Sequence, residues 1–475
     1  MKKISIYIMA IGLLFGCTDD LKNATDFTSV ENPNLSESSI VGQPNSSLIW
    51  LAGLEREMAL TLNEILILSE LGSDNYVNTQ TFFSQFLDNL EIRIDDPDMR
   101  DTQFRIARIR VAAQFGLNQV GPGDSEYTSA TEAEYNFFEG MSYLYAGMYF
   151  SALPQEELGV PVSSADNLAS AIASFETAIA LNPQPEYWLA LARANYYLGN
   201  QTEAVTAAQN AIALDNDFLR SAQYDQLNGP VNLFENALYQ RGTFDDLQPL
   251  PTLDFLDPKY SFLTPDRDQS VHYLKAEEAY LILAESNLAN SNLLAAQNNL
   301  QDLLSLIDTR EVRNIDDSIE QRPDPSSVFD DRPSSPSVVV NGRAGLVLDR
   351  QSGNIDVPTV SGTSLTSADV TAMTLGDAAL ELLYRTRQEV FIAEGLRFAD
   401  MGVKLVIHEN EILQNPNVSE GDLGTVAVIP SFIDAVKNDL DAINFVPGSN
   451  TATTVINLTE ILVANKNSDQ VLPFH

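Results

Sequence analysis

Cysteine, histidine and positive charge are all scarce in this sequence. A single cysteine in 475 residues excludes an internal disulfide. Three histidines, His272, His408 and His475, have no cysteine or histidine neighbours at ligand spacing, which argues against a transition-metal site. Lysine and arginine number 27 against 66 acidic residues, and the net charge of −39 repels phosphate backbones. Nucleic-acid binding is therefore excluded as a function class.

Long hydrophobic runs are also missing. The longest apolar stretch, residues 4–15, is shorter than the roughly 20 residues that a transmembrane helix needs. The composition is otherwise globular, with 44% hydrophobic and 20% charged residues, so the chain has enough apolar residues for a sizeable core.

The one cysteine lies directly after the apolar stretch. Lys2 and Lys3, the apolar run and the small Gly16 form a secretory signal over residues 1–16. The segment Leu14–Cys17 resembles the lipobox of bacterial lipoproteins, and Thr18–Asp20 resembles the acidic export tag of surface lipoproteins in Bacteroidetes-type bacteria. We expect a lipid on Cys17, acyl chains that hold the protein at the outer membrane, and a flexible tether over residues 17–44. The alternative is a plain cleaved signal.

An internal repeat predicts the fold class. The segment Ala178–Leu181 recurs unchanged at Ala211–Leu214, and the intervening residues have helical periodicity with a stop at Gly199. This resembles the tetratricopeptide repeat, in which Trp188 packs between helices. The sequence predicts a mostly α protein, with tetratricopeptide-like hairpins in a short right-handed solenoid and a loop-rich region with a few short β-strands. Helices are expected at about 45–72, 126–153, 166–215 and 270–310.

Long segments between these helices are rich in proline, serine, aspartate or glycine. We predict a loop-rich ligand region over about 73–125, 216–269 and 311–375, and further helices over 376–475, all within a single body from residue 45 to 475. The dipeptide Asn341-Gly342 between two apolar runs predicts a β-hairpin.

One segment near the C-terminus has a distinctive pattern of charges. It reads "RQEVFIAEGLRFADM" over residues 387–401. On a continuous helix Arg385 and Glu389, Glu394 and Arg397, and Arg397 and Asp400 would form side-by-side pairs, a structural stripe. Glu389 and Glu394 diverge on such a helix, which argues against a catalytic pair.

This segment resembles the C-terminal signature of the SusD/RagB family of outer-membrane lipoproteins. The residues that fit the pattern are Glu389, Glu394, Gly395, Arg397 and Asp400. The stretches 134–161 and 272–286 are similar to other parts of the family. The resemblance implies a non-enzymatic protein that binds oligosaccharides or peptides at the cell surface. It also implies a SusC-like TonB-dependent transporter as partner, with the helical repeats toward the transporter and the ligand in the irregular region.

The stretch "GSDNYVNTQTFFSQ" (72–85) is the first candidate ligand site, because it offers hydrogen-bonding side chains beside aromatic rings. A second candidate lies in the loop 249–265. The alternative is that these aromatic rings fill the core. The candidate residues are Asp74, Asn75, Tyr76, Asn78, Phe82, Phe83, Tyr260 and Phe262.

Two other function classes stay open at the level of sequence. One is a tetratricopeptide scaffold lipoprotein in envelope assembly, and the other is a glycan hydrolase, although no hydrolase, metalloprotease or phosphate-loop motif occurs. No cofactor is expected. The acidic run at 94–101 could hold a structural calcium ion, although such runs are usually solvated.

The first prediction concerns the anchor. The Cys17→Ser protein should keep its fold and lose membrane attachment, because the thiol is the site of lipidation. Fractionation of lysed cells checks this, with circular dichroism as the control for folding. Retention of the variant in the membrane fraction would contradict a lipid anchor at Cys17.

Overall fold

The computed structural model describes residues 40–78, 83–239, 247–253, 255–256, 268–316, 337–343 and 354–475. The predicted signal peptide, Cys17 and most of the tether lie outside these ranges and stay predictions. Among the described helices, none combines the length and the apolar character that crossing a bilayer requires.

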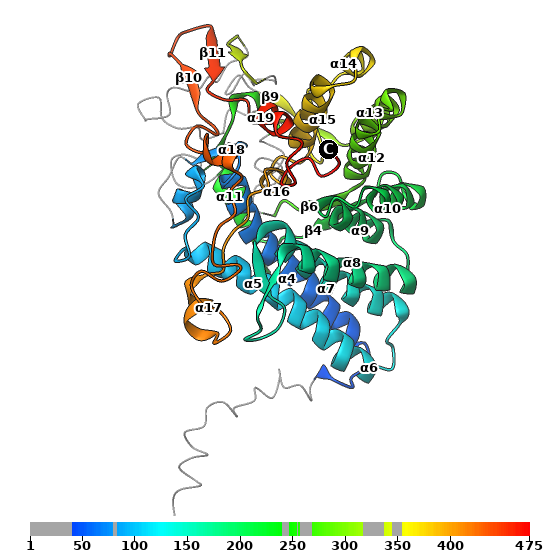
Figure 1. Cartoon of the computed structure of the whole chain (residues 1–475). Coiled ribbons are helices and arrows are strands. Elements are labelled where there is room, and N and C mark those ends of the chain that lie inside the picture. Colours follow the sequence, from blue (N-terminus) through cyan, green and yellow to red (C-terminus); the bar gives the residue numbers. More distant parts are fainter. Residues whose placement is uncertain are drawn as a thin grey trace, which may run out of the picture.

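Helices make up most of the described chain (Figure 1). The long helices are α4 Ser46–Leu71, α5 Pro97–Phe115, α7 Ser129–Tyr149, α8 Ser164–Leu181, α9 Pro185–Tyr197, α10 Gln201–Leu214, α12 Ala276–Ala289, α13 Leu293–Ile307 and α15 Asp377–Val390. The shorter helices are α6 Gly121–Gly123, α11 Leu233–Tyr239, α14 Ser367–Ala372, α16 Leu396–Asp400, α17 Glu409–Gln414, α18 Ser431–Asp434 and α19 Leu458–Ala464.

Helical hairpins form one side of the molecule. Figure 1 shows the pairs α7–α8, α9–α10 and α12–α13 following one another along this side. Between α9 and α10 the chain reverses at Gly199, whose φ of +73° suits a residue without a side chain. Ala204 and Ala208 on α10 are fully buried, and small side chains at these positions let α9 and α10 approach closely. The predicted fold class, mostly α with tetratricopeptide-like hairpins and short strands, is confirmed.

Gly140 shows why small residues matter in these hairpins. It lies on α7 opposite Phe175 of α8, and a Cβ atom at position 140 would lie 2.5 Å from Phe175 Cε1. The ring of Phe175 therefore occupies the space that any other residue at position 140 would need.

Trp188, predicted to be in the core, is half-buried and packs against the core.

The strands are short and lie between the helices. The antiparallel pairs are β1 Tyr76–Asn78 with β5 Leu247–Pro249, β2 Ala152–Pro154 with β3 Pro161–Ser163, β4 Leu219–Ala222 with β6 Val271–Lys275, β7 Val312–Asp316 with β9 Asn354–Pro358, and β10 Ile443–Phe445 with β11 Thr451–Thr454. The strand β8 Val339–Asn341 pairs with β11 in parallel. The second run of the hairpin expected at Asn341-Gly342 lies outside the described residues, so that hairpin stays a prediction.

Two predicted boundaries are wrong. The stretch 73–125, expected to be loop-rich, contains α5, whose Ile106, Ile109 and Ala113 are fully buried. Its alternation of apolar and charged residues is that of a helix with one buried face. Residues 376–475, expected to be helical, hold α15 and α16 and then mainly turns, short helices and the β10–β11 hairpin.

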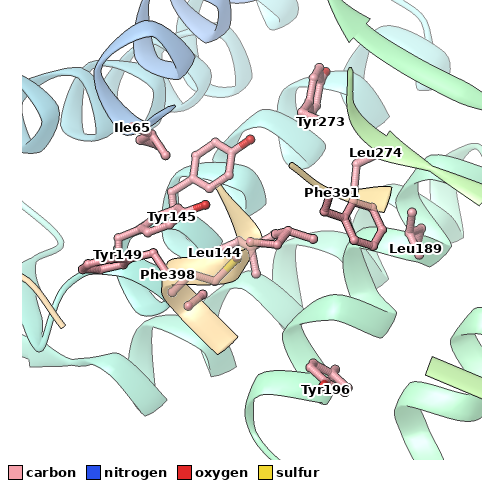
Figure 2. Packing of buried hydrophobic residues seen from close by; sticks show 14 of the residues in the cluster. Ile65, Leu144, Tyr145, Tyr149, Leu189, Tyr196, Tyr273, Leu274, Phe391 and Phe398 are labelled. Atoms are coloured by element: carbon pink, nitrogen blue, oxygen red, sulfur yellow. The ribbon is translucent and has the colours of Figure 1, made fainter. Parts of the chain in front are cut away.

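One cluster of buried apolar residues extends from Leu54 to Leu472, so the described parts of the chain share a core. Figure 2 shows Tyr145 and Tyr149 of α7 close to Phe398 of α16, and the ring centroids of Tyr149 and Phe398 lie 6.5 Å apart. The C-terminal part of the chain therefore packs directly on the N-terminal helices.

A protonated carboxyl is expected inside this core. Glu285 on α12 is buried, and the Tyr196 hydroxyl donates to its Oε2 at 2.7 Å. Burial raises the pKa of Glu285 to about 7 from 4.5. Between pH 4.5 and pH 7 the folded protein therefore keeps a proton on Glu285 that the unfolded chain has released. Stability should therefore be lost as the pH rises from about 4.5 to about 7, and stay lower above that.

We predict that Glu285→Gln removes the loss of stability between pH 4.5 and pH 7. The free energy of unfolding of the variant, relative to the parent, should rise between pH 4.5 and 7 and then level off. Urea unfolding at a series of pH values measures it, with Glu203→Gln on the exposed face of α10 as the control. Parallel pH curves for the parent and Glu285→Gln would contradict the proposed titration.

Candidate functional site

The signature segment is not one continuous helix. The helix α15 ends at Val390, Ala393 and Gly395 have φ values of 63° and 80°, and α16 begins at Leu396. At Gly395 a Cβ atom would lie 2.8 Å from Ser69 Oγ, and the Gly395 N–H donates to Glu70 Oε1 at 2.7 Å. Glycine is needed here for the left-handed conformation and for the close approach of α4.

The charges of the signature pair with other elements. Glu394 binds Lys275 Nζ at 2.7 Å, and Arg397 Nε lies 2.6 Å from Asp74 Oδ1. Asp400 binds Arg387 at 2.7 Å and accepts from the Tyr197 hydroxyl at 3.0 Å. The predicted pairs of Arg397 with Glu394 and Asp400 are wrong. The break before α16 separates Glu394 from Arg397, and Asp400, on the same short helix as Arg397, is bound by Arg387 instead.

Glu389 is buried and accepts hydrogen bonds from three donors of the loop before α14. Thr363 Oγ1, Ser364 N and Ser364 Oγ each lie 2.7 Å from its carboxylate oxygens. Among the described residues no ion pair joins it to Arg385, so that predicted pair is also wrong. A carboxylate with these donors, and 0% exposed, is a structural group rather than a general acid or base.

The first candidate ligand residues belong to the same network. Asp74 is 2% exposed and is bound by Arg397. Asn75 donates to Glu70 Oε2 at 2.7 Å and accepts from Gln388 Nε2 at 2.8 Å. Tyr76 begins β1 and is fully buried. The prediction that Asp74, Asn75 and Tyr76 contact a ligand is therefore wrong: they join the end of α4 to the signature.

A further charged segment at the start of α12 ties the hairpins together. Lys275 reaches Glu394, as described above, and Glu277 binds Arg310 at 2.8 Å after α13. Glu278 binds Arg193 of α9 at 2.6 Å. All three side chains are 1% exposed or less, so a short stretch of sequence is joined by buried charges to three other parts of the fold. Sequence reasoning missed these pairs, because nothing local in the sequence identifies the partners.

The remaining candidate residues are at or beyond the edge of the described chain. The Asn78 N–H donates to Asp88 Oδ1 at 2.9 Å, which anchors the end of β1. Phe82, Tyr260, Phe262 and the side chain of Phe83 lie outside the described residues, so their part in ligand binding stays a prediction.

Phe86 is an exposed aromatic side chain that the sequence analysis missed. It lies in the 3₁₀ helix η2 Phe83–Asn89, beside β1 and one residue beyond the quoted stretch 72–85. Its side chain is 39% exposed, and the Arg93 guanidinium lies 4.5 Å from the ring centroid. We call β1, β5 and η2 the loop face. Its exposed ring lies beside Arg93, which follows η2 and is paired with Asp95 at 2.8 Å. A ring next to polar groups is an arrangement suited to the apolar face of a sugar and its hydroxyl groups.

A cavity of 510 Å³ lies between α9, α16 and the C-terminal residues. Its lining includes Lys404, whose Nζ donates to the carbonyls of Gly147 and Met148 at 2.8 and 2.7 Å. Burial lowers the pKa of Lys404 to about 8. Because these carbonyls are at the end of α7, Lys404 satisfies a helix terminus, which is a structural role.

In the acidic run at 94–101, the carboxylates of Asp95, Asp96 and Asp101 are engaged locally. Asp95 pairs with Arg93 at 2.8 Å, Asp96 caps α5 by accepting from Asp98 N, and Asp101 pairs with Arg100 at 2.7 Å. In the described part of the chain no group of three or more His, Cys, Asp or Glu residues is arranged to hold a metal ion. A bound calcium ion stays a hypothesis without an assigned site.

Comparison with known proteins finds similarity in fold alone. No protein-family model and no curated protein matches the sequence. A SusD superfamily protein of Bacteroides fragilis is similar with a TM-score of 0.54 at 14% identity, covering 80% of this chain and 99% of that one. A SusD-like carbohydrate-binding protein of Bacteroides vulgatus is similar with a TM-score of 0.50 at 12% identity, covering 76% and 83%. The chain has a SusD-like fold. The resemblance to the SusD/RagB family noted in the sequence is therefore confirmed for the fold.

The buried pair of Arg397 and Asp74 supplies a stability prediction. Arg397→Met should lower the free energy of unfolding by about 3–5 kcal/mol, because it leaves the Asp74 carboxylate buried without a counterion. The double variant Asp74→Leu with Arg397→Met should recover much of this loss. Urea unfolding measures both.

The control for this prediction is Arg100→Met, which removes an exposed pair whose side chains are 48% and 45% exposed. It should leave stability nearly unchanged. Equal losses for Arg397→Met and Arg100→Met would show that the buried pair has no special role.

Proposed function

We propose that this protein is a lipid-anchored, non-enzymatic glycan-binding protein. In this proposal it captures oligosaccharides at the surface of the outer membrane and delivers them to a SusC-like TonB-dependent transporter. The observation that carries the proposal is the SusD-like fold, held together by the signature residues that suggested the family. Bound peptides are the second ligand class that the resemblance implies.

The state of the signature acids argues against a catalytic role for them. Glu389, Glu394 and Asp400 are each engaged by donors or cations and are at most 9% exposed, so they do not face a substrate. A glycosidase needs two accessible carboxyl groups on either side of the scissile bond. The exposed ring of Phe86 beside Arg93 on the loop face favours binding.

A binding assay combined with a hydrolysis assay tests the proposal. The detergent-solubilised lipoprotein should bind at least one polysaccharide or oligosaccharide of a broad panel in affinity electrophoresis and calorimetry. It should release no reducing ends from that glycan on long incubation. Cleavage would establish the hydrolase alternative, and binding of envelope proteins but no glycan or peptide would establish the scaffold alternative.

A variant on the loop face makes the test specific. Phe86→Ala should weaken glycan binding by about tenfold, because it removes a stacking surface worth about 1.4 kcal/mol. The matched control is Leu294→Ala, which removes an exposed apolar side chain from α13 on the hairpin side. Unchanged affinity of Phe86→Ala for every bound glycan would remove the loop face from the site.

A further inference from the structure

A surface groove along α5 has features of a binding site. None of its lining residues belongs to the loop face. It has a volume of 430 Å³ and is lined by α5, by the turn between β2 and β3, and by α17. The α5 and α17 walls are joined by a hydrogen bond of 3.4 Å from Gln103 Nε2 to Glu411 Oε2. We call this the α5 groove.

An arginine in the wall of the α5 groove has no carboxylate partner. Arg110 is 3% exposed, and its Nη2 donates to the Pro154 carbonyl at 3.0 Å. Its Nε has no hydrogen-bond partner among the described residues, and burial lowers its pKa. Three other deeply buried arginines, Arg193, Arg387 and Arg397, each lie within 2.7 Å of a carboxylate oxygen. A fourth, Arg343, donates to Gln388 Oε1 at 2.8 Å and to Thr252 Oγ1 at 2.9 Å. Leaving a buried guanidinium without a counterion costs free energy, and a ligand oxygen would offset part of it.

The apolar wall of the groove includes an exposed aromatic ring. Phe104 is 53% exposed, and Val111, two turns further along the same face of α5, is 61% exposed. Arg108 covers one part of the ring at 5.6 Å from its centroid. Leu158, at the β2–β3 turn, is 49% exposed and adds an apolar side chain from the facing segment.

Hydrogen-bond acceptors complete the lining. Glu156 and Glu157 are exposed in the β2–β3 turn, and Glu411 is held by the Asn415 amide at 2.7 Å. With Arg108 and Arg110 on the other side, the groove presents donors and acceptors together, and its carboxylates outnumber its guanidinium groups. This charge balance disfavours an anionic ligand, and the buried Arg110 disfavours a purely apolar one.

We propose that the α5 groove binds an uncharged sugar ring of an oligosaccharide, as a second glycan site lined by residues other than those of the loop face. Phe104 stacks on the apolar face of the ring, Arg110 donates to a ring or hydroxyl oxygen, and Glu156 and Glu157 accept from hydroxyl groups. This inference rests on the proposed function, since it assumes that the protein captures glycans.

The test measures stoichiometry as well as affinity. The probes are malto-, cello-, xylo- and mannohexaose, with hexagalacturonate as the anionic comparison, in calorimetry and native mass spectrometry. For the neutral hexaose that binds, the parent should hold two molecules. Ala107→Trp, which fills the groove, and Phe104→Ala should each hold one, and Phe104→Tyr should keep two because the ring is retained.

The control and the variants distinguish the two proposals. Leu294→Ala should keep both sites, whereas Phe86→Ala should lose the loop-face site and keep the groove site. Unchanged stoichiometry and affinity in both Ala107→Trp and Phe104→Ala would overturn the groove and leave the proposed function intact. Binding of hexagalacturonate alone would overturn the assignment to a neutral sugar, and no binding of any probe by the parent would overturn both proposals for these glycans.

Discussion

Arg397 and Asp74 are both buried, and their side chains meet at 2.6 Å across 323 positions of the sequence. Around this pair, Glu70 accepts from the Gly395 backbone and from Asn75, and Asn75 in turn accepts from Gln388. The end of the first long helix and the signature are thus held by one set of polar contacts. Removing a member leaves a buried charge or amide unsatisfied, which makes this joint sensitive to substitution.

Buried charge pairs also join the hairpins to distant parts of the chain. Lys275, Glu277 and Glu278 lie within four positions of one another. Lys275 binds the signature turn, Glu277 binds Arg310 after α13, and Glu278 binds α9. Hairpins that contact mainly their neighbours are therefore also joined to the C-terminal part by charge pairs. Such pairs contribute directional constraints that apolar packing lacks.

This arrangement separates structural polar residues from those available to a ligand. The acidic and amide residues of the signature and of the 74–76 stretch are used inside the protein, whereas Phe86 and Phe104 are exposed and Arg93 is half-buried. The exception is Arg110, which is buried without a carboxylate although the chain carries 66 acidic residues. The contrast with Arg193, Arg387 and Arg397, together with the Nε of Arg110 that has no hydrogen-bond partner among the described residues, is the main reason to regard the α5 groove as a binding site.

The sequence by itself determined the helices of the hairpin side and their pairing, because apolar periodicity, the Ala178–Leu181 repeat and the stop at Gly199 are local signals, whereas α5 was not expected. Tertiary structure alone decided the partners of the charged residues. Arg397 has acidic residues three positions away on both sides, and a helix would have paired it with them. The left-handed turn at Ala393 and Gly395 separates it from Glu394, Arg387 binds Asp400, and Arg397 binds the distant Asp74 instead. The sequence suggested a ligand contact for Asp74, and the structure gives it a buried ion pair. Burial and a distant counterion are properties of the folded chain, and they leave no trace in the local sequence.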